Sequence, residues 1–175
     1  MQTAENQRLQ VFVRDANLRI NYGVNNMVKG CLFCAIVEGK IPSFKVYEDK
    51  GHLAILDIFP NTYGMTLLLT KKHYDSYIFD MPQNAYFQLM KAAVKVGKKL
   101  DKNLKVKRTA IVMEGMGINH AHIKFYPLHG LENKFKEIWA KTSIYFKKYK
   151  GYLSTQLGPR ADEKQLQRLA KKLKK

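Results

Sequence analysis

His120, His122 and Lys124 alternate with apolar residues in the stretch NHAHIKFYP. On a β-strand this alternation places three ionisable side chains on one face, and that face is suited to holding phosphate. An imidazole attacks a phosphoryl group through one ring nitrogen when a hydrogen bond, for example to a neighbouring carbonyl, holds the other. Two histidines at this spacing also suit a half-buried cross-strand pair or a metal clip, so the spacing alone leaves all three interpretations open.

Two cysteines and a further histidine offer ligands for a metal. Cys31 and Cys34 form a CxxC pair, and His73 follows two lysines after the apolar run 65–69. With His120 they make up a Cys₂His₂ set of the kind that binds zinc. In a reducing compartment a CxxC pair favours a metal site over a disulfide framework, and a redox pair is the alternative.

The surrounding pattern predicts an α+β domain that positions these residues. Short runs of β-branched and aliphatic residues, separated by turn-forming segments, predict strands at 44–48, 53–57, 66–70, 106–113 and 121–126. A helix is expected from a cap at Asp80, with Pro82 in its first turn, to 101–103, because apolar residues recur at helical spacing. The expected result is a five-stranded antiparallel sheet, with the helix on one face and the phosphate site on the other.

Three sequence blocks resemble the signatures of the histidine-triad (HIT) proteins, a family of nucleotide hydrolases and nucleotidyl transferases. The blocks are CLFCAIVEGKIPSFKVYED, LAILDIFPNTYGMTLLLTKKH and INHAHIKFYP. They occur in the family's order and at similar spacing, and they cover roughly residues 30 to 130. One block would be weak evidence, whereas three in order are a specific signal. The resemblance implies a HIT-like fold, in which two sheets commonly pair across a homodimer.

The resemblance implies a role for individual residues. His122, the middle triad position, would be the nucleophile that takes the nucleoside phosphate. His120 would join the two cysteines and His73 at a structural zinc with all four positions filled by protein. Asp57 would bind ribose hydroxyls, for which a carboxylate is a suitable acceptor. The base pocket would be lined by three apolar residues, Leu32, Phe33 and Ile58.

The third triad position departs from the family pattern. Lys124 stands there in place of histidine, in the register set by Pro127; a register that begins at Ile118 fits this proline less well. Lysine keeps a positive charge near the phosphate, but with an unperturbed pKa of about 10.4 it donates a proton less readily than imidazole at neutral pH. We therefore expect Lys124 to take part in catalysis that is slowed or retuned. His129, just after the strand, is expected to be a surface turn residue.

The loop before the triad also departs from the pattern. The segment 114–119, EGMGIN, is shorter than usual, and Met116 and Gly117 stand where many members carry a phosphate-binding side chain. Gly117 and Asn119 remain as candidate phosphate contacts, because glycines at 115 and 117 let backbone N–H groups approach an anion closely. A simple tight turn is the alternative.

Length and composition favour one domain with appendages. The chain has 175 residues, of which 46% are hydrophobic, enough for one sizeable core. We divide it into an N-terminal extension (1–29), a HIT domain (30–130) and a C-terminal extension (131–175). No stretch has the pattern of a signal peptide or the roughly 18 apolar residues of a membrane span, so a cytoplasmic protein is expected.

Neither extension carries a chemical motif. The N-terminal one contributes only a small apolar set, Leu9, Val11, Phe12, Val13, Leu18 and Ile20. After Gly130, aromatic residues with lysines between them predict a helix that packs on the domain or across a dimer; stacking on nucleic-acid bases is the alternative. From Arg160 onward, seven basic residues against two acidic ones, with a leucine stripe, predict an amphipathic basic helix. That helix would dock on nucleic acid or an anionic membrane surface, or would simply be solvated.

The net charge of +17 would attract polyphosphates or nucleic acid, although a lysine-rich proteome would produce the same composition.

Three hypotheses about function follow. The favoured one is a hydrolase or nucleotidyl transferase that cleaves a dinucleoside polyphosphate or nucleoside phosphoramidate through a nucleotidyl-histidine. The second is an enzyme acting on nucleotide-capped nucleic-acid ends. The third is a nucleotide-binding module with little turnover, because Lys124 replaces the third histidine.

Overall fold

The structure is a computed structural model that describes residues 30–138, 140–154, 162 and 164. The chain divides into two compact units, residues 1–133 and 134–175. Two predictions lie outside the described residues: the apolar set of the N-terminal extension, and the basic helix from Arg160 apart from Asp162 and Lys164. The candidate site residues all belong to the first unit.

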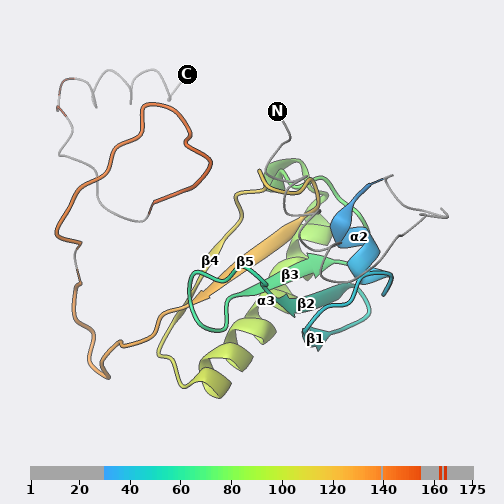
Figure 1. Ribbon diagram of the computed structural model, residues 1–175, viewed down its shortest axis with the longest axis horizontal. Helices are drawn as coiled ribbons and strands as arrows, with labels where there is room; N and C mark the ends of the chain where they lie inside the picture. Colours follow the sequence, from blue (N-terminus) through green and yellow to red (C-terminus); the bar gives the residue numbers. More distant parts are fainter. Residues whose placement is uncertain (1–29, 139, 155–161, 163, 165–175) are drawn as a thin grey trace. The chain divides into compact units, whose positions relative to one another are not determined.

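A five-stranded antiparallel sheet forms the centre of the first unit (Figure 1). In chain order the strands are β1 Lys45–Glu48, β2 His52–Leu56, β3 Thr66–Thr70, β4 Thr109–Val112 and β5 His122–Pro127. Their spatial order is β1-β2-β3-β5-β4, so β5 lies between β3 and β4. This placement brings the histidine stretch into the sheet interior and confirms the predicted α+β architecture with a five-stranded antiparallel sheet.

The two faces of the sheet pack against different helices. Side chains that alternate toward one face form a core with helix α3, Gln83–Leu104; from the sheet these are Ala54, Leu68, Ile123 and Phe125. The opposite face packs against the short helix α2, Leu32–Val37, through Leu53, Ile55, Leu67 and Leu69. His122 pairs with Leu69 and Lys124 with Leu67, so these two candidate residues lie on the α2 face. The predicted separation of the long helix from the candidate site is therefore confirmed.

Helix α3 begins later and ends later than predicted. Its N-cap is Pro82, and Asp80 belongs to a preceding 3₁₀ turn, η1 Ile78–Asp80, so the predicted cap at Asp80 is wrong. Proline suits the start of a helix, where its missing N–H is not needed. The helix continues to Leu104 and ends at Lys105, whose φ of 54° is left-handed. Asp101 secures this end by accepting a hydrogen bond from the Thr109 hydroxyl at 2.7 Å.

The histidine stretch is only partly in the strand. β5 begins at His122, and His120 lies in the bend before it, so the prediction of three residues alternating on one strand is wrong for His120. Two backbone hydrogen bonds give the physical reason: the N–H of His120 bonds to the nearby carbonyl of Ile118, and the N–H of Ala121 bonds to the carbonyl of Tyr74, in a distant segment of the chain. These bonds turn the His120 side chain toward the cysteines rather than along the sheet.

The aromatic segment of the second unit is not the predicted helix. The described residues 134–138 and 140–154 contain neither helix nor strand, and Phe146 contacts Tyr152 with ring centroids 5.2 Å apart. Helices of this length depend on packing an apolar face, and several aromatic side chains here remain exposed, among them Phe135 and Tyr145. Within the described residues no helix is long and apolar enough to cross a membrane.

Candidate functional site

Four ligand atoms converge from three separate segments. Cys31 precedes α2 and Cys34 lies within it, His73 follows β3, and His120 precedes β5. The Cys31 sulfur is 3.4 Å and the Cys34 sulfur 3.6 Å from Nδ1 of His120, and Cys34 is 3.3 Å from Nδ1 of His73. All four ligand atoms lie within 4.8 Å of one another. The structure thus brings the predicted Cys₂His₂ set together.

This spacing fits a tetrahedral metal ion. Zinc bonds of about 2.3 Å to sulfur and 2.0–2.1 Å to nitrogen place tetrahedral ligand atoms about 3.4–3.8 Å apart. The three separations given above lie in or close to this range. Two soft thiolates with two imidazoles are also a donor set that favours zinc, and four protein ligands leave no open position. The cluster is therefore able to bind a metal, with zinc the best chemical match.

A hydrogen bond behind His120 fixes the orientation of this ligand. Nε2 of His120 lies 2.8 Å from the carbonyl oxygen of Thr70 and donates to it, which directs Nδ1 to the cysteines. Nε2 of His73 is 3.7 Å from Oδ1 of Asp75, which is an ion-pair distance rather than a hydrogen bond. Sequence reasoning missed Thr70, because a backbone carbonyl leaves no mark in the residue type.

The cluster is electrostatically prepared for a cation. Burial and the neighbouring Cys31 raise the pKa of the Cys34 thiol to about 12, and burial lowers the pKa of His120 to about 4. A buried thiolate is costly when nothing balances its charge. A divalent ion between the sulfurs supplies that balance, and a neutral imidazole is the form that ligates a metal.

His122 is held as a neutral imidazole with one free nitrogen. Its Nδ1 donates to the backbone oxygen of His120 over 2.6 Å, so Nε2 keeps its lone pair. The side chain is buried, and burial lowers its pKa below the ordinary 6.5. The ring of Phe33 contacts it edge-on, with centroids 5.1 Å apart. This is the arrangement that a phosphoryl-attacking imidazole needs, and the neighbouring carbonyl that holds it belongs to His120.

Lys124 lies on the same sheet face as His122 and is paired with an acid. Its Nζ donates to Oε2 of Glu114 at 3.0 Å, and both side chains are largely buried. Two residues further along β5, Tyr126 shares this face. Burial raises its phenol pKa; the charge of Lys124 opposes this rise, and the charges of Glu114 and Asp57 add to it. Sequence reasoning missed both Glu114 and Tyr126, although the alternation along β5 was a usable signal for Tyr126.

The shortened loop before the triad is tied down by its own side chains. The Asn119 amide donates to Oδ1 of Asp75 at 2.8 Å and accepts from the backbone N–H of Ser76 at 2.9 Å. The Ser76 hydroxyl donates to the carbonyl of Gly115 at 2.7 Å. The amide nitrogen and the amide oxygen of Asn119 are thus both hydrogen-bonded within the protein, and these bonds fix the loop to residues 75 and 76. Gly117 lies in the same loop without a positive φ.

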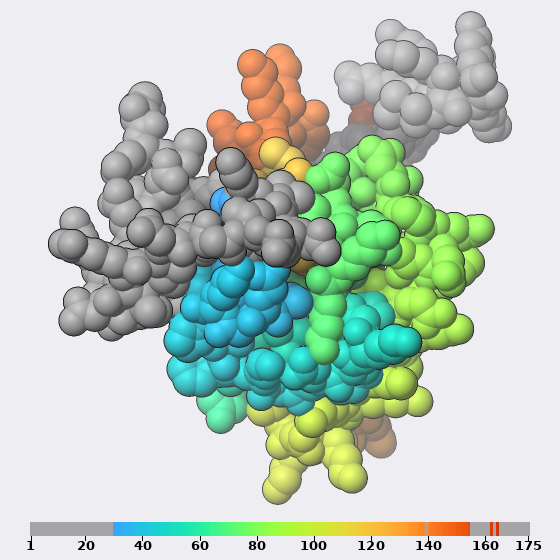
Figure 2. All heavy atoms as spheres, turned by 90° about the vertical axis from the view of Figure 1, so that its right-hand side faces the viewer, coloured from blue at the N-terminus to red at the C-terminus, as the bar shows by residue number. Residues whose placement is uncertain are grey.

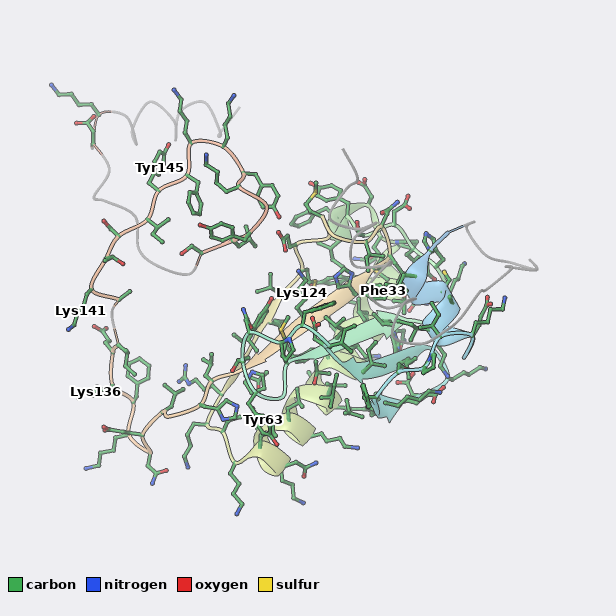
Figure 3. The ribbon with its side chains drawn as sticks, in the orientation of Figure 1. Phe33, Tyr63, Lys124, Lys136, Lys141 and Tyr145 are labelled. Atoms are coloured by element: carbon green, nitrogen blue, oxygen red, sulfur yellow. The ribbon has the colours of Figure 1, made fainter. Side chains whose placement is uncertain are left out.

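The remaining predicted residues are distributed around this face. Asp57 follows β2 and is partly exposed, and its Oδ1 accepts from the backbone N–H of Phe59 at 2.8 Å. Phe33 is buried in the α2 core, Leu32 packs against that core, and Ile58 is 42% exposed. In Figure 3 Phe33 comes from α2, Lys124 from β5 and Tyr63 from the loop between β2 and β3. His129 is an exposed turn residue, as predicted, and bonds to the carbonyl of Tyr63.

Comparison with known proteins gives a consistent family match. The family model for the HIT domain matches residues 38–129. An uncharacterized HIT-like protein of Methanocaldococcus jannaschii is 36% identical over 115 residues, which cover 62% of this chain and 88% of the relative. The adenosine 5'-monophosphoramidase HNT1 of Saccharomyces cerevisiae is 30% identical over 99 residues, 57% of this chain and 60% of that enzyme.

Solved structures agree with these sequence matches. A crystal structure of a Streptococcus mutans protein superposes with a TM-score of 0.62 at 29% identity, covering 88% of this chain and 89% of that one. A zinc-bound histidine triad family protein of Mycobacterium smegmatis gives a TM-score of 0.51 at 28% identity, covering 62% of this chain and 83% of that one. The similarity therefore includes a relative that binds zinc.

Proposed function

The chain belongs to the HIT family, and we propose that it cleaves the α-phosphate linkage of a nucleotide conjugate through a covalent nucleotidyl intermediate on His122. The substrates we propose are dinucleoside polyphosphates and nucleoside phosphoramidates. The family match over residues 38–129 supports a nucleotide hydrolase or transferase. The phosphoramidase activity in the name of the yeast relative supports the second substrate class.

The observation that carries this proposal is the hydrogen bond from Nδ1 of His122 to the His120 carbonyl, at 2.6 Å. It leaves Nε2 as the nucleophile. In the first step Nε2 forms a bond to the α-phosphorus, and the bond from phosphorus to the leaving group breaks. The leaving group departs with the electron pair and takes up a proton from solvent. In the second step water attacks the same phosphorus and gives up a proton to solvent, the bond to Nε2 breaks, and His122 is restored.

Lys124 assists this reaction mainly through its charge. Its ammonium group lies on the same face as His122 and is oriented by Glu114. A fixed positive charge in a largely buried place stabilises negative charge that develops on the phosphate. As a proton donor it is weaker than the imidazole it replaces, because its ordinary pKa is about 10.4.

The rest of the site binds and positions the nucleotide. Asp57 would accept from the ribose hydroxyls, and backbone N–H groups near Gly117 would contact phosphate. The base would rest against Leu32, Phe33 and Ile58. Asn119 would act indirectly, since its amide holds the loop through Asp75 and Ser76.

Zinc would be bound by Cys31, Cys34, His73 and His120 as a structural ion. When bound, it would cross-link the segments before β5 and after β3 to helix α2. The chain's own residues would carry the chemistry, because the four protein ligands leave no position for substrate.

The cytoplasmic location and the homodimer, with sheets pairing between copies, stay predictions.

The test is intact-protein mass spectrometry after mixing with diadenosine polyphosphate or an adenosine phosphoramidate and quenching without acid. The wild-type protein should show a nucleotidyl adduct or release nucleotide, and His122→Ala should abolish turnover while leaving unfolding unchanged. Equal loss of stability in both His122→Ala and Cys31→Ala would mean that His122 is structural.

One observation favours a second candidate, a nucleotide-binding module with little turnover. The Lys124–Glu114 pair neutralises part of the charge that the phosphate would otherwise meet. Nucleotide binding without adduct or product in the same experiment would establish this second function in place of the first.

A further inference from the structure

An exposed line of residues runs along helix α3. Successive members are three or four residues apart, so they stack on one side of the helix; they are Asn84, Phe87, Lys91, Lys95, Lys98 and Lys102. The first and last residues of this line are 18 positions apart, which is five full turns of helix and about 27 Å along the axis. Because five whole turns return to the same direction, the line is straight. We call its four lysines the α3 lysine stripe.

The four lysines of the stripe have no acidic partner among the residues that the structure describes. None of the ion pairs between described residues involves its four lysines, and Asp101, the one acidic residue of α3, is occupied by the hydroxyl of Thr109. Like charges three and four residues apart repel and destabilise a helix. A helix face that only needs to be soluble usually mixes both signs. The cost of this arrangement points to an anionic partner.

The straight row of lysines fits some partners better than others. A second copy of the chain is excluded on the stripe itself, since a symmetric contact would set lysines against lysines. A membrane-surface helix needs an apolar face to insert, but that of α3 is already buried against the sheet through Leu89, Ala93 and Val96. A nucleic-acid strand offers a linear row of phosphates. Successive lysines of the stripe are separated by about 4.5 or 6 Å along the helix axis. Successive phosphates of a stacked strand are about 3.4 Å apart, so each step between lysines spans one to two phosphates.

We propose that the α3 lysine stripe binds the phosphate backbone of single-stranded nucleic acid, with Phe87 stacking against a base. Phe87 is 50% exposed and lies one turn before Lys91, so a base next to the bound phosphates reaches its ring. The stripe lies on the side of α3 away from the sheet, and His122 lies on the opposite sheet face. In Figure 2 α3, green to yellow-green, forms the right-hand border of its unit, with side chains projecting outward. The inference goes beyond the proposed nucleotide chemistry and does not depend on it.

The test is fluorescence anisotropy of a labelled 20-nucleotide oligouridylate with the full chain, over a range of salt concentrations. The variant changes all four stripe lysines to glutamine, which removes charge while keeping helix propensity. We expect at least a tenfold loss of affinity near 0.1 M salt. We also expect the slope of log affinity against log salt to shrink by about 3, since each lost phosphate contact contributes about 0.7. Phe87→Ala should weaken binding about fivefold or more without changing the slope.

A matched control neutralises four lysines of the second unit, at Lys141, Lys147, Lys148 and Lys150. It should change affinity less than about threefold. An equal loss in the control, no binding by the wild-type chain, or binding only to vesicles of anionic lipid would each overturn the proposal. Hydrolysis of a small nucleotide conjugate should be unaffected by the stripe variant. If the wild type shows no hydrolysis at all, the proposed function fails while the binding test still stands.

Discussion

At the scale of single residues, the proposed nucleophile His122 has a charged neighbour, Lys124, on the same sheet face. His122 is neutral, buried and held through Nδ1. Two residues along β5, the Nζ of Lys124 donates a hydrogen bond to Oε2 of Glu114 at 3.0 Å. This ion pair holds the ammonium group on the sheet face that also carries His122. In the mechanism that we propose, Lys124 contributes electrostatic stabilisation and leaves proton transfer to the leaving group without an efficient donor at this position.

This division of roles predicts a gain of activity. Lys124→His should raise kcat for a substrate with a poor leaving group by about tenfold or more, because imidazole transfers protons effectively near neutral pH. Substrates with a good leaving group should gain little. The measurement is steady-state kinetics on a pair of adenosine phosphoramidates that differ in leaving-group basicity.

Lys124→Arg is the matched control, since it keeps the charge and cannot act as an acid. It should stay at or below the wild-type rate. If Lys124→His is slower than wild type with both substrates, proton transfer by the third position does not limit the reaction.

At the scale of elements, the short loop before β5 leads into His120 of the Cys₂His₂ cluster and then into His122. Its anchor is the network of Asn119, Asp75, Ser76 and Gly115. Gly115 has a φ of +73°, and an added Cβ would lie 2.7 Å from the backbone oxygen of Ser76. A backbone atom cannot move aside by changing rotamer, so only glycine fits.

Gly115→Ala should therefore destabilise the protein by about 2–3 kcal/mol, from positive-φ strain together with the clash. It should also lower nucleotide turnover, because the displaced loop leads directly into His120 and His122. Urea unfolding and steady-state kinetics provide the two readouts.

Gly39→Ala separates the two causes. Gly39 has a similar φ of +74°, with nothing within 4 Å of an added Cβ. The substitution Gly39→Ala should lower the free energy of unfolding by only about 1 kcal/mol and leave turnover unchanged. Equal effects of the two substitutions would show that the contact with Ser76 is unimportant.

At the scale of the whole molecule, the Cys₂His₂ cluster brings together elements that the hydrogen-bonded sheet does not join. Its residues come from helix α2 and the residue before it, and from the segments that follow β3 and precede β5. Helix α2 has only six residues and covers one face of the sheet. So short a helix is marginal without tertiary support. Metal binding is thus expected to be coupled to stability.

Cys31→Ala should abolish stoichiometric zinc and lower the melting temperature, and a chelator should do the same to the wild type. At a free metal concentration of about 1,000 times Kd, the bound ion would add about 4 kcal/mol. Elemental analysis and thermal unfolding with and without chelator measure both effects. His129→Ala is the control, since this exposed histidine lies outside the cluster. Unchanged zinc content in Cys31→Ala would refute the ligand assignment.

What the sequence by itself determined was the arrangement of elements and the residues available for chemistry. Alternating and helical apolar patterns depend on local geometry, so the five strands and the long helix α3 were predictable, as was the cluster of Cys31, Cys34, His73 and His120. Three ordered blocks also predicted the HIT family. The helix start at Pro82 and the first residue of β5 were misplaced, because capping and backbone hydrogen bonds with distant segments set these boundaries.

Only the tertiary structure decided the partners of those residues. The Thr70 carbonyl behind His120, the pairing of Lys124 with Glu114 and the use of Asn119 as a loop anchor are contacts between segments far apart in sequence or across a strand pair. The α3 lysine stripe needed both kinds of information. Its spacing is written in the sequence, but the side of α3 that stays exposed is set by which residues pack on the sheet. A residue's type limits what it can bind, and the folded chain determines what lies within its reach.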